Sequence, residues 1–326
     1  MSGGERGAVN APLRILVVAD VGERHLQMIR EAAPGALVEQ TVERAQVVRL
    51  AREADVIVGW NVPREAVQQA KRLRWIHSTA AGVDQLLHPE VVEGEVLVTD
   101  SSGIHAEPIT EHVLAVMLAF ARRLPVAIRN QAARRWDRRA ALGEELWGKT
   151  AGILGLGSIG REVAARCKAF GMSVIGTRRT PQEVPGVDRV YPPEGLDEVL
   201  AASDYLVIVL PLTARTRGLI GARELALMKP DAYLINVARG PIVQEAALVE
   251  ALRAGRLRGA ALDVFEQEPL PQDSPLWELE QVILTPHVSG AAPDYYDRAL
   301  PLLCENLRRF QAGMPLLNVV DKDQGY

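Results

Sequence analysis

The chain has 326 residues, of which 48% are apolar, and its formal net charge at neutral pH is −4. This length exceeds what one hydrophobic core usually supports, so two domains are expected. The near balance of 37 basic and 41 acidic residues leaves no global positive field, which argues against binding to nucleic acid or to an anionic membrane.

The first third of the chain alternates short apolar runs with segments of helical periodicity. The apolar runs of strand length are 15–18, 56–60, 75–76 and 96–98. Helical periodicity is clearest at 23–33 and 64–71. This alternation is typical of βα units that form a parallel sheet.

A longer amphipathic helix is predicted over 107–123, where it would connect the two domains. A second series of βα units follows. Its predicted strands are 153–154, 174–175, 205–210, 232–237, 259–264 and 282–284. The segment 294–311 is predicted to be helical, and 318–326 to be a short polar tail. The expected fold is therefore two doubly wound, parallel-sheet α/β domains.

A glycine-rich motif opens the second series. The pattern G-x-G-x-x-G occupies 155–160, between a strand-like run at 150–154 and a helical segment at 161–170. The glycines permit a tight turn, close approach of the backbone to a pyrophosphate, and packing of the helix on the strand, while the helix N-terminus offers N–H groups to phosphates. The residues predicted to bind the dinucleotide here are Gly155, Gly157, Ser158, Ile159 and Gly160.

The end of the next predicted strand bears on which dinucleotide is bound. In NAD sites, an Asp or Glu about 20 residues beyond the glycines binds the ribose. Here Thr177, Arg178 and Arg179 stand at that place, and no carboxylate is present. Two guanidiniums can pair with a 2′-phosphate, so NADP is the favoured cofactor. NAD remains the alternative, in which both arginines are solvated loop residues.

Three further segments, 235–240, 262–271 and 285–290, carry polar residues in a fixed order after the glycine motif. Together the four motifs resemble the D-isomer-specific 2-hydroxyacid dehydrogenases, a family that includes phosphoglycerate dehydrogenases and glyoxylate/hydroxypyruvate reductases. The resemblance covers nearly the whole chain and is densest over 146–290. It implies an oxidoreductase that moves a hydride between a nicotinamide cofactor and a small 2-oxo or 2-hydroxy acid.

The resemblance implies that Arg239, Glu268 and His287 are catalytic, and their chemistry suits the reaction. The always-charged, forked guanidinium of Arg239 can hold carboxylate and carbonyl oxygens of the substrate. Imidazole is the commonest general acid or base in proteins, so His287 can donate or accept the proton that accompanies hydride transfer. Glu268 matches the family's carboxylate partner of the histidine, and Glu266 is the alternative partner. Alone, each of these residues would more often be structural.

The resemblance also implies contacts further along the cofactor. Val237 and Ala238 are expected to present backbone groups to the nicotinamide, and His287 lies near the same ring. Asp263 is expected near the carboxamide, or else acts as a cap at the end of its strand. Pro211 and Thr216 should lie along the cofactor cleft, because ligands of open α/β sheets bind outside the carboxyl ends of strands.

The segment 77–84, after the strand at 75–76, resembles the family's substrate loop. Ala81, Gly82 and Val83 are the predicted substrate contacts there, with Arg239, because small residues leave backbone N–H groups free to receive a carboxylate. The family more often has a glycine at the position of Ala81. The alternative is an ordinary turn between a strand and a helix.

These assignments imply a discontinuous, flavodoxin-like substrate domain of residues 1–105 and 290–326, and a Rossmann cofactor domain of residues 106–289, with the active site between them. The resemblance implies a homodimer packed through the cofactor domains and the arginine-rich segment 122–139. That segment is otherwise a solvated helical face.

Glyoxylate/hydroxypyruvate reductase is the favoured activity, and phosphoglycerate dehydrogenase is the main alternative. The chain ends at Tyr326 without a regulatory domain, and the predicted NADP site favours a reductase. Formate dehydrogenases carry glutamine where Glu268 stands, which argues against that relative. A dinucleotide-sensing corepressor of the same fold is the alternative from another class, and turnover of 2-oxo acids would separate it from an enzyme.

The remaining expectations concern location and metals. Cys167 and Cys304 are too few for a disulfide framework and lack the spacing of metal ligands, so no metal site is expected. No apolar run approaches the roughly 18 residues that a membrane span needs. Residues 1–12 are predicted to be a flexible tail rather than a signal peptide. We therefore expect a soluble, cytoplasmic protein.

Overall fold

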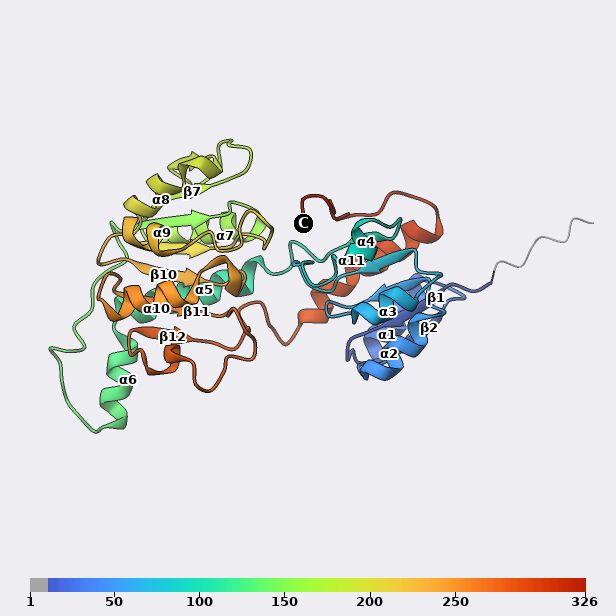
Figure 1. Cartoon of the computed structure of the whole chain (residues 1–326), viewed down its shortest axis with the longest axis horizontal. Coiled ribbons are helices and arrows are strands. Elements are labelled where there is room, and N and C mark those ends of the chain that lie inside the picture. The colour runs from blue at the N-terminus through green and yellow to red at the C-terminus, as the bar shows by residue number, and fades with distance from the viewer. Residues whose placement is uncertain (1–10) are drawn as a thin grey trace, which may run out of the picture. The chain divides into compact units, whose positions relative to one another are not determined.

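The computed structural model describes residues 11–326, so most of the predicted N-terminal tail lies outside the described residues. The chain forms two compact units (Figure 1). Unit 1 holds the described residues up to Ile104 together with Pro293–Tyr326, and unit 2 holds His105–Ala292. Each contains one parallel sheet between helices, which confirms the predicted fold class.

Unit 1 contains a five-stranded sheet with the order β2-β1-β3-β4-β5, which is the flavodoxin-like order. The strands are β1 (Arg14–Val17), β2 (Leu37–Gln40), β3 (Val56–Val58), β4 (Trp75–His77) and β5 (Leu97–Thr99). The helices are α1 (Glu23–Ala32), α2 (Arg44–Ala51), α3 (Arg64–Gln69), α4 (Pro89–Val92) and α11 (Tyr295–Gln311). All neighbouring strands pair in parallel.

Side chains along β1 point alternately to the two faces of the sheet, and each face has its own core. Ile15 and Val17 face one core with α1 and α11, whereas Leu16 faces the other core with α2 and α3. Strands buried on both faces read as continuous apolar runs, which is why the sequence shows them clearly. The C-terminal residues extend this sheet: Val319 bridges Thr99 in antiparallel fashion, so the predicted polar tail is partly ordered at the edge of β5.

Unit 2 contains a seven-stranded parallel sheet with the order β12-β11-β10-β9-β6-β7-β8. The strands are β6 (Thr150–Leu154), β7 (Ser173–Thr177), β8 (Arg189–Tyr191), β9 (Tyr205–Ile208), β10 (Tyr233–Asn236), β11 (Gly259–Leu262) and β12 (Val282–Leu284). The α-helices are α5 (Ala106–Ala121), α6 (Leu124–Ala132), α7 (Ser158–Ala169), α8 (Leu196–Ala202), α9 (Ala222–Leu227) and α10 (Glu245–Arg253), and the 3₁₀ turns are η1 (Pro193–Gly195), η2 (Gly240–Ile242) and η3 (Pro275–Glu278).

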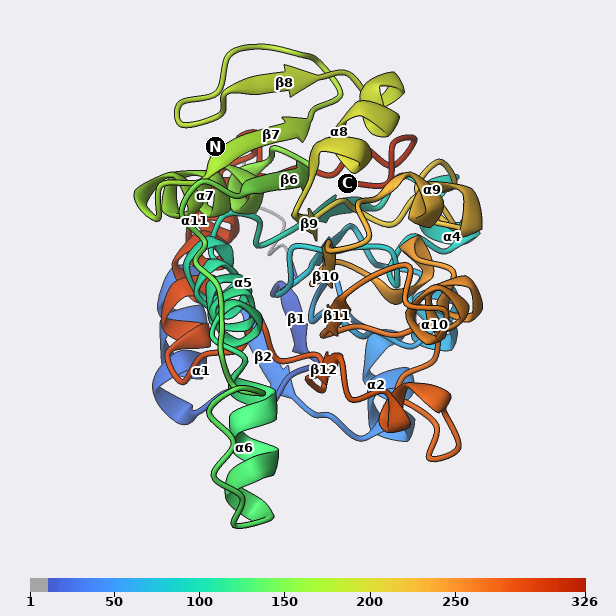
Figure 2. The same ribbon diagram turned by 90° about the vertical axis from the view of Figure 1, so that its left-hand side faces the viewer.

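The order of connections reverses between β6 and β9, where open α/β sheets bind ligands. Helices α5 and α7 pack on one face of this sheet, while residues of α8, α9 and α10 belong to the core on the other face (Figure 2). The carboxyl ends of β6, β9 and β10 therefore form the edge at which a dinucleotide would be expected.

The predicted helix 107–123 is shorter in the structure. It ends at Ala121, because Arg123 adopts a left-handed backbone with φ of 51°, and Pro125 then stands in the first turn of α6. Helix α6 projects from the rest of unit 2 in both ribbon views.

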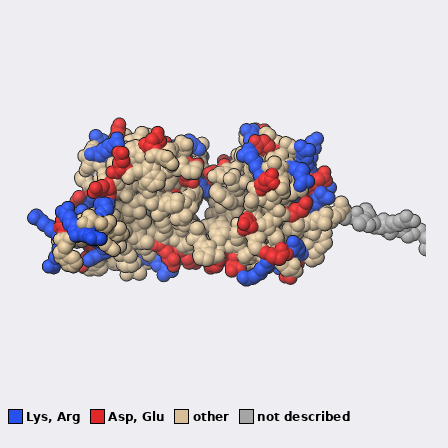
Figure 3. Space-filling model, turned by 90° about the horizontal axis from the view of Figure 1, so that it is seen from below, with Lys and Arg blue, Asp and Glu red and all other residues tan. Residues whose placement is uncertain are grey.

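The surface carries both signs of charge on each unit in the face drawn in Figure 3. Within residues 11–326, no helix combines the length and apolar character needed to cross a membrane. No group of three or more His, Cys, Asp or Glu side chains in this range is arranged to hold a metal ion.

Candidate active site

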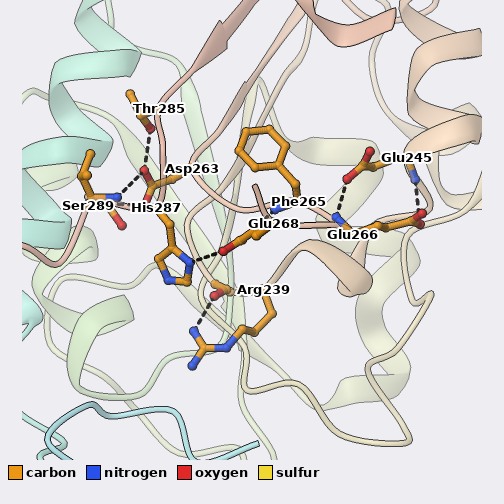
Figure 4. A network of polar contacts seen from close by, with 11 residues as sticks. Arg239, Glu245, Asp263, Phe265, Glu266, Glu268, Thr285, His287 and Ser289 are labelled. Atoms are coloured by element: carbon orange, nitrogen blue, oxygen red, sulfur yellow. Dashed lines mark hydrogen bonds and ion pairs between the residues drawn. The ribbon is translucent and has the colours of Figure 1, made fainter. Parts of the chain in front are cut away.

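Three neighbouring strands of unit 2 bring the predicted catalytic residues to one edge of the sheet. β10 aligns Asn236 with Leu262 of β11, and Leu262 aligns with Leu284 of β12. Because the strands are parallel, the segments that follow them leave the sheet at the same edge. These segments carry Arg239, Glu268 and His287, and Figure 4 draws the contact between His287 and Glu268 and, separately, the contact of Arg239 with a backbone carbonyl.

The imidazole of His287 contacts the carboxylate of Glu268, with 2.7 Å between Nδ1 and Oε2. The other oxygen, Oε1, accepts a hydrogen bond of 3.0 Å from the backbone N–H of Phe265. The carboxylate is therefore held from two sides and fixes the ring orientation. Nε2 of His287 has no hydrogen-bond partner among the described residues, and each of the two side chains is 36% exposed. That nitrogen is available for proton transfer.

The alternative partner, Glu266, does not contact the imidazole. Its Oε1 accepts a hydrogen bond of 3.1 Å from the backbone N–H of Glu245, and the Glu245 carboxylate accepts from the N–H of Glu266. Burial raises the pKa of Glu245 above its usual value, and the nearby Glu266 carboxylate adds to this rise. Glu266 thus connects the start of α10 to the loop after β11.

Asp263 fixes the loop that carries His287. Its side chain is 1% exposed, and Oδ1 accepts hydrogen bonds from Thr285 Oγ1 at 2.6 Å and from the N–H of Val288 at 2.9 Å. Oδ2 accepts from the N–H of Ser289 at 2.8 Å. His287 has a φ of 53°, a left-handed conformation that is uncommon for residues other than glycine. These contacts match the predicted strand-end cap; the predicted contact of Asp263 with the carboxamide stays a prediction.

Arg239 follows β10 and is positioned through its backbone. Its carbonyl accepts a hydrogen bond of 3.0 Å from Asn236 Nδ2, and Nη1 of its guanidinium donates to the carbonyl of Ala238 at 2.8 Å. Val237 and Ala238 are buried, and the N–H of Ala238 donates to Asn236 Oδ1 at 3.1 Å. A side chain at Gly240 would collide with the backbone of Phe265, so glycine is required there.

The glycine motif forms the turn between β6 and α7. Gly155 has a φ of +103°, and a Cβ there would lie 2.8 Å from the carbonyl oxygen of Val209. A Cβ at Gly160 would collide with the Gly155 carbonyl, whereas one at Gly157 would meet nothing within 4 Å. Gly157 is the N-cap of α7 and provides no side-chain acceptor. The N–H groups of Ser158 and Ile159 have no acceptor among the described residues. The turn can therefore accept a phosphate.

The different surroundings of these glycines predict a contrast between two substitutions. Gly157→Asn should leave the free energy of unfolding within about 0.5 kcal/mol of wild type, because asparagine is a favourable N-cap and its Cβ meets open space. It should weaken binding of a dinucleotide by about tenfold or more, because the new side chain competes for the N–H groups predicted to bind the phosphates. Chemical denaturation and fluorescence titration with NADPH measure the two quantities.

Gly160→Ala is the matched comparison for this prediction. It should lower the free energy of unfolding by about 1–3 kcal/mol, because the new methyl group overlaps the Gly155 carbonyl. Unchanged NADPH affinity in Gly157→Asn would show that the turn does not hold the pyrophosphate.

The two arginines predicted to pair with a ribose 2′-phosphate lie beside this turn. Leu154 of β6 aligns with Thr177 of β7, and the N–H of Leu156 donates to the Thr177 carbonyl at 2.9 Å. Arg178 and Arg179 follow directly, with Arg178 half-buried and Arg179 exposed. The first carboxylate beyond them is Glu183.

The loop after β9 lies at the same edge, between β6 and β10 in the sheet order. Thr216 Oγ1 donates to the carbonyl of Pro211 at 2.7 Å and accepts from the N–H of Thr213 at 2.8 Å. Both hydroxyl functions are used within the loop, so Thr216 shapes this wall of the edge. Its predicted contact with the cofactor stays a prediction.

The predicted substrate loop belongs to unit 1, where it follows β4. Val83 is buried, while Ala81 and Gly82 are half-buried. The backbone N–H groups of these three residues have no acceptor among the described residues. Small, N–H-rich turns of this kind receive carboxylates in proteins. Their contact with a substrate stays a prediction.

Comparison with known proteins agrees with this geometry. Residues 114–289 match the NAD-binding domain of the D-isomer specific 2-hydroxyacid dehydrogenases. A glyoxylate reductase of Korarchaeum cryptofilum is 33% identical, with 95% of this chain and 96% of that protein covered. The chain belongs to the D-isomer specific 2-hydroxyacid dehydrogenase family. The resemblance predicted from the four motifs is thereby confirmed.

Other members of the family differ in length from this chain. A D-3-phosphoglycerate dehydrogenase of Methanocaldococcus jannaschii is 35% identical over 95% of this chain, but the chain spans only 59% of that protein. A solved structure described as an NADPH-dependent glyoxylate/hydroxypyruvate reductase from Sinorhizobium meliloti, in complex with NADP and sulfate, has a TM-score of 0.84 and 30% identity, covering 96% of this chain and 100% of that chain.

Sequence reasoning missed two residues of this family member that position the loop carrying His287. Thr285 and Ser289 flank His287 and both donate to Asp263. The available signal was an aspartate, Asp263, directly after an apolar strand. A second apolar strand follows, and after it two small polar residues stand on either side of a histidine. That signal does not specify which oxygen meets which donor, because the partners are more than 20 residues apart.

Proposed function

We propose that the chain is an NAD(P)-dependent D-2-hydroxyacid dehydrogenase of the glyoxylate/hydroxypyruvate reductase type. The observation that carries this proposal is the contact between His287 Nδ1 and Glu268 Oε2 at 2.7 Å, at the sheet edge that also presents Arg239 and the glycine turn. In this proposal unit 2 is the cofactor domain and unit 1 is the substrate domain, with Ala81, Gly82 and Val83 receiving the substrate carboxylate.

Each catalytic side chain has one task in the proposed reduction. The nicotinamide, when bound, supplies the hydride. The guanidinium of Arg239 binds oxygens of the 2-oxo acid and withdraws electron density from the carbonyl. Nε2 of His287 donates a proton to the C2 oxygen, and Glu268 holds the ring through Nδ1 and stabilises its protonated form. In the oxidative direction Nε2 accepts the proton instead.

The predicted NADP site favours a reductase over a phosphoglycerate dehydrogenase. A corepressor that only senses the dinucleotide would not need an imidazole paired with a carboxylate beside an arginine, so the His287–Glu268 pair also favours catalysis over sensing.

NADP is the proposed cofactor, because Arg178 and Arg179 stand next to the glycine turn where a carboxylate would favour NAD. Loss of a hydrogen bond to a charged group costs about 1.5–3 kcal/mol, so each arginine that contacts the 2′-phosphate should favour NADPH by about 10- to 100-fold. The solved relative from Sinorhizobium meliloti is described with NADP.

A spectrophotometric panel tests the activity and the cofactor together. Glyoxylate, hydroxypyruvate, pyruvate, phenylpyruvate and phosphohydroxypyruvate are each assayed with NADPH and with NADH. We expect the highest kcat/KM with glyoxylate or hydroxypyruvate and NADPH. Arg178→Ser and Arg179→Ser should raise the KM for NADPH and leave the KM for NADH nearly unchanged.

Each other outcome of the panel contradicts one part of the proposal. Equal efficiency with both cofactors would contradict the NADP preference, and the best turnover with phosphohydroxypyruvate would favour the phosphoglycerate alternative. Absence of turnover with all five acids would contradict the enzyme assignment.

A homodimer formed through α6 and the arginine-rich segment is part of the proposal. Ile128 of α6 and Trp136 and Leu142 beyond it are exposed, with Trp136 98% exposed, and apolar side chains of this size usually mark contact surfaces. A cavity of about 280 Å³ lies beside α6, where Arg129 and Tyr233 contribute to its lining. Light scattering of the purified chain tests this, since a mass of 35.5 kDa would contradict a dimer.

A cytoplasmic location is also proposed. Both cysteines are free and buried, which suits a reducing compartment. Cell fractionation followed by immunoblotting tests the location, and recovery in a membrane or secreted fraction would contradict it.

A further inference from the structure

The predicted substrate loop is tied to the last helix of unit 1 by one hydroxyl group. Tyr295, the first residue of α11, donates a hydrogen bond from its hydroxyl to the backbone carbonyl of Thr79. Thr79 is 2% exposed. Burial raises the pKa of Tyr295 to about 12, so the hydroxyl keeps its proton at neutral pH. The contact joins residues that are 216 positions apart in the sequence.

The same stretch of loop is held from a second side by the residues after β5. Ser101 Oγ donates to the carbonyl of Ser78 at 2.9 Å, and the N–H of Ser101 donates to the carbonyl of Ala80 at 3.1 Å. The carbonyl groups of residues 78, 79 and 80 are therefore each occupied. Beyond them, the backbone N–H groups of Ala81, Gly82 and Val83 lack acceptors among the described residues, as does the N–H of Thr79 within the anchored stretch.

The loop therefore has two parts: residues 78–80, whose carbonyls are hydrogen-bonded, and residues 81–83, whose N–H groups can bind an anion. The orientation of a peptide plane is shared by its carbonyl and the next N–H, because the peptide bond is planar. Fixing the carbonyls of 78–80 therefore sets the direction in which the chain enters 81–83. Ser101 holds the peptide planes before and after the Thr79–Ala80 peptide. The Thr79–Ala80 plane itself is held at its carbonyl by the hydroxyl of Tyr295 and at the N–H of Ala80 by Ser78 Oγ, at 3.2 Å.

We propose that Tyr295 is a positioning residue for substrate binding, whose hydroxyl fixes the Thr79 carbonyl and so aims the N–H groups of Ala81 and Gly82 at the carboxylate of the 2-oxo acid. This inference rests on the proposed function. Tyr295 does not touch the substrate and acts through the loop.

The test compares Tyr295→Phe with Tyr296→Phe. Tyr296 is a matched control, because its ring packs against that of Tyr295 with 5.4 Å between centroids and its hydroxyl makes no hydrogen bond with a described residue. Tyr295→Phe should raise the KM for glyoxylate by about 3- to 10-fold, the effect of one net hydrogen bond, with kcat and the Kd for NADPH changed by less than about twofold. Tyr296→Phe should change none of these quantities.

Hydrogen exchange provides a measurement that does not depend on turnover. Backbone amides in peptides covering residues 78–87 should exchange faster in Tyr295→Phe than in wild type, and at the wild-type rate in Tyr296→Phe. Glyoxylate is the probe for kinetics, and oxalate, a dicarboxylate of similar size, is the probe for binding to the NADPH-loaded enzyme. Oxalate binding should weaken in parallel with the KM for glyoxylate.

The outcomes separate this inference from the proposed function. An active wild type with unchanged KM and oxalate affinity in Tyr295→Phe would overturn the positioning role and leave the enzyme assignment intact. Equal rises of KM in both variants would show a general packing effect and would also overturn it. A wild type that reduces no 2-oxo acid would overturn the proposed function and this inference with it.

Discussion

Replacement of His287 by alanine is expected to lower kcat for 2-oxo acid reduction by about 10²–10⁴-fold, the usual contribution of a positioned acid or base. The imidazole is the group whose free nitrogen, Nε2, can reach a substrate oxygen while Nδ1 stays bonded to Glu268. The Kd for NADPH should change by less than about twofold, because the glycine turn proposed to hold the phosphates is untouched. Steady-state kinetics and fluorescence titration measure both.

Two glutamates provide the control for this prediction. Glu268→Gln should also lower kcat, because an amide lacks the negative charge that stabilises the protonated ring. Its oxygen is also a weaker hydrogen-bond acceptor for the Nδ1–H. Glu266→Gln should leave kcat close to wild type, because Glu266 contacts Glu245 and not His287. Near-normal turnover in His287→Ala would reject the acid/base role, and equal losses in the two glutamine variants would reject the special role of Glu268.

Replacement of Arg239 by glutamine is expected to lower kcat/KM for glyoxylate by at least about 10- to 100-fold, which corresponds to one or more hydrogen bonds to a charged group. The cause is loss of the planar, permanently charged guanidinium that is proposed to bind the substrate oxygens. The position of the backbone should be preserved, because Asn236 bonds the carbonyl of residue 239 rather than its side chain. Kinetics with glyoxylate at saturating NADPH measure the effect.

Arg239→Lys distinguishes charge from geometry in this prediction. Lysine keeps the positive charge but not the fork, so we expect it to recover only part of the loss. Arg253→Gln, an exposed change on α10, is the control and should behave as wild type. If Arg239→Gln lowered the free energy of unfolding by as much as the free energy that corresponds to its loss of kcat/KM, the residue would be structural.

The sequence predicted the buried strands well, and of the four edge strands it predicted β5 and β12 but not β2 and β8. β9 and β10 are buried at every position and read as continuous apolar runs. β2 and β8 were not predicted, because both lie at sheet edges and have exposed or half-buried residues throughout. An edge strand buries little apolar surface, so its sequence carries little hydrophobic pattern.

The candidate site shows a similar division between local and long-range information. The glycine turn could be predicted because its physical demands are local to residues 155–160. Glu268 was preferred over Glu266 only through the family resemblance. The residues alone left both open, because both glutamates lie in one loop and its path decides which one contacts His287. The role of Tyr295 was not predicted, because its partner is a backbone carbonyl in a distant loop. Every residue has a backbone carbonyl, so the sequence does not indicate which one a tyrosine will bond.

The discontinuity of unit 1 has a consequence for synthesis on the ribosome. Unit 2 is one uninterrupted stretch, so all of its strands have emerged before α11 is made. One apolar face of the unit 1 sheet, with Ile15 and Trp75, stays uncovered by Leu300 and Leu303 until that helix arrives. Nascent chains should therefore pass through a stage in which the second unit is already folded while the first still exposes a surface that chaperones bind.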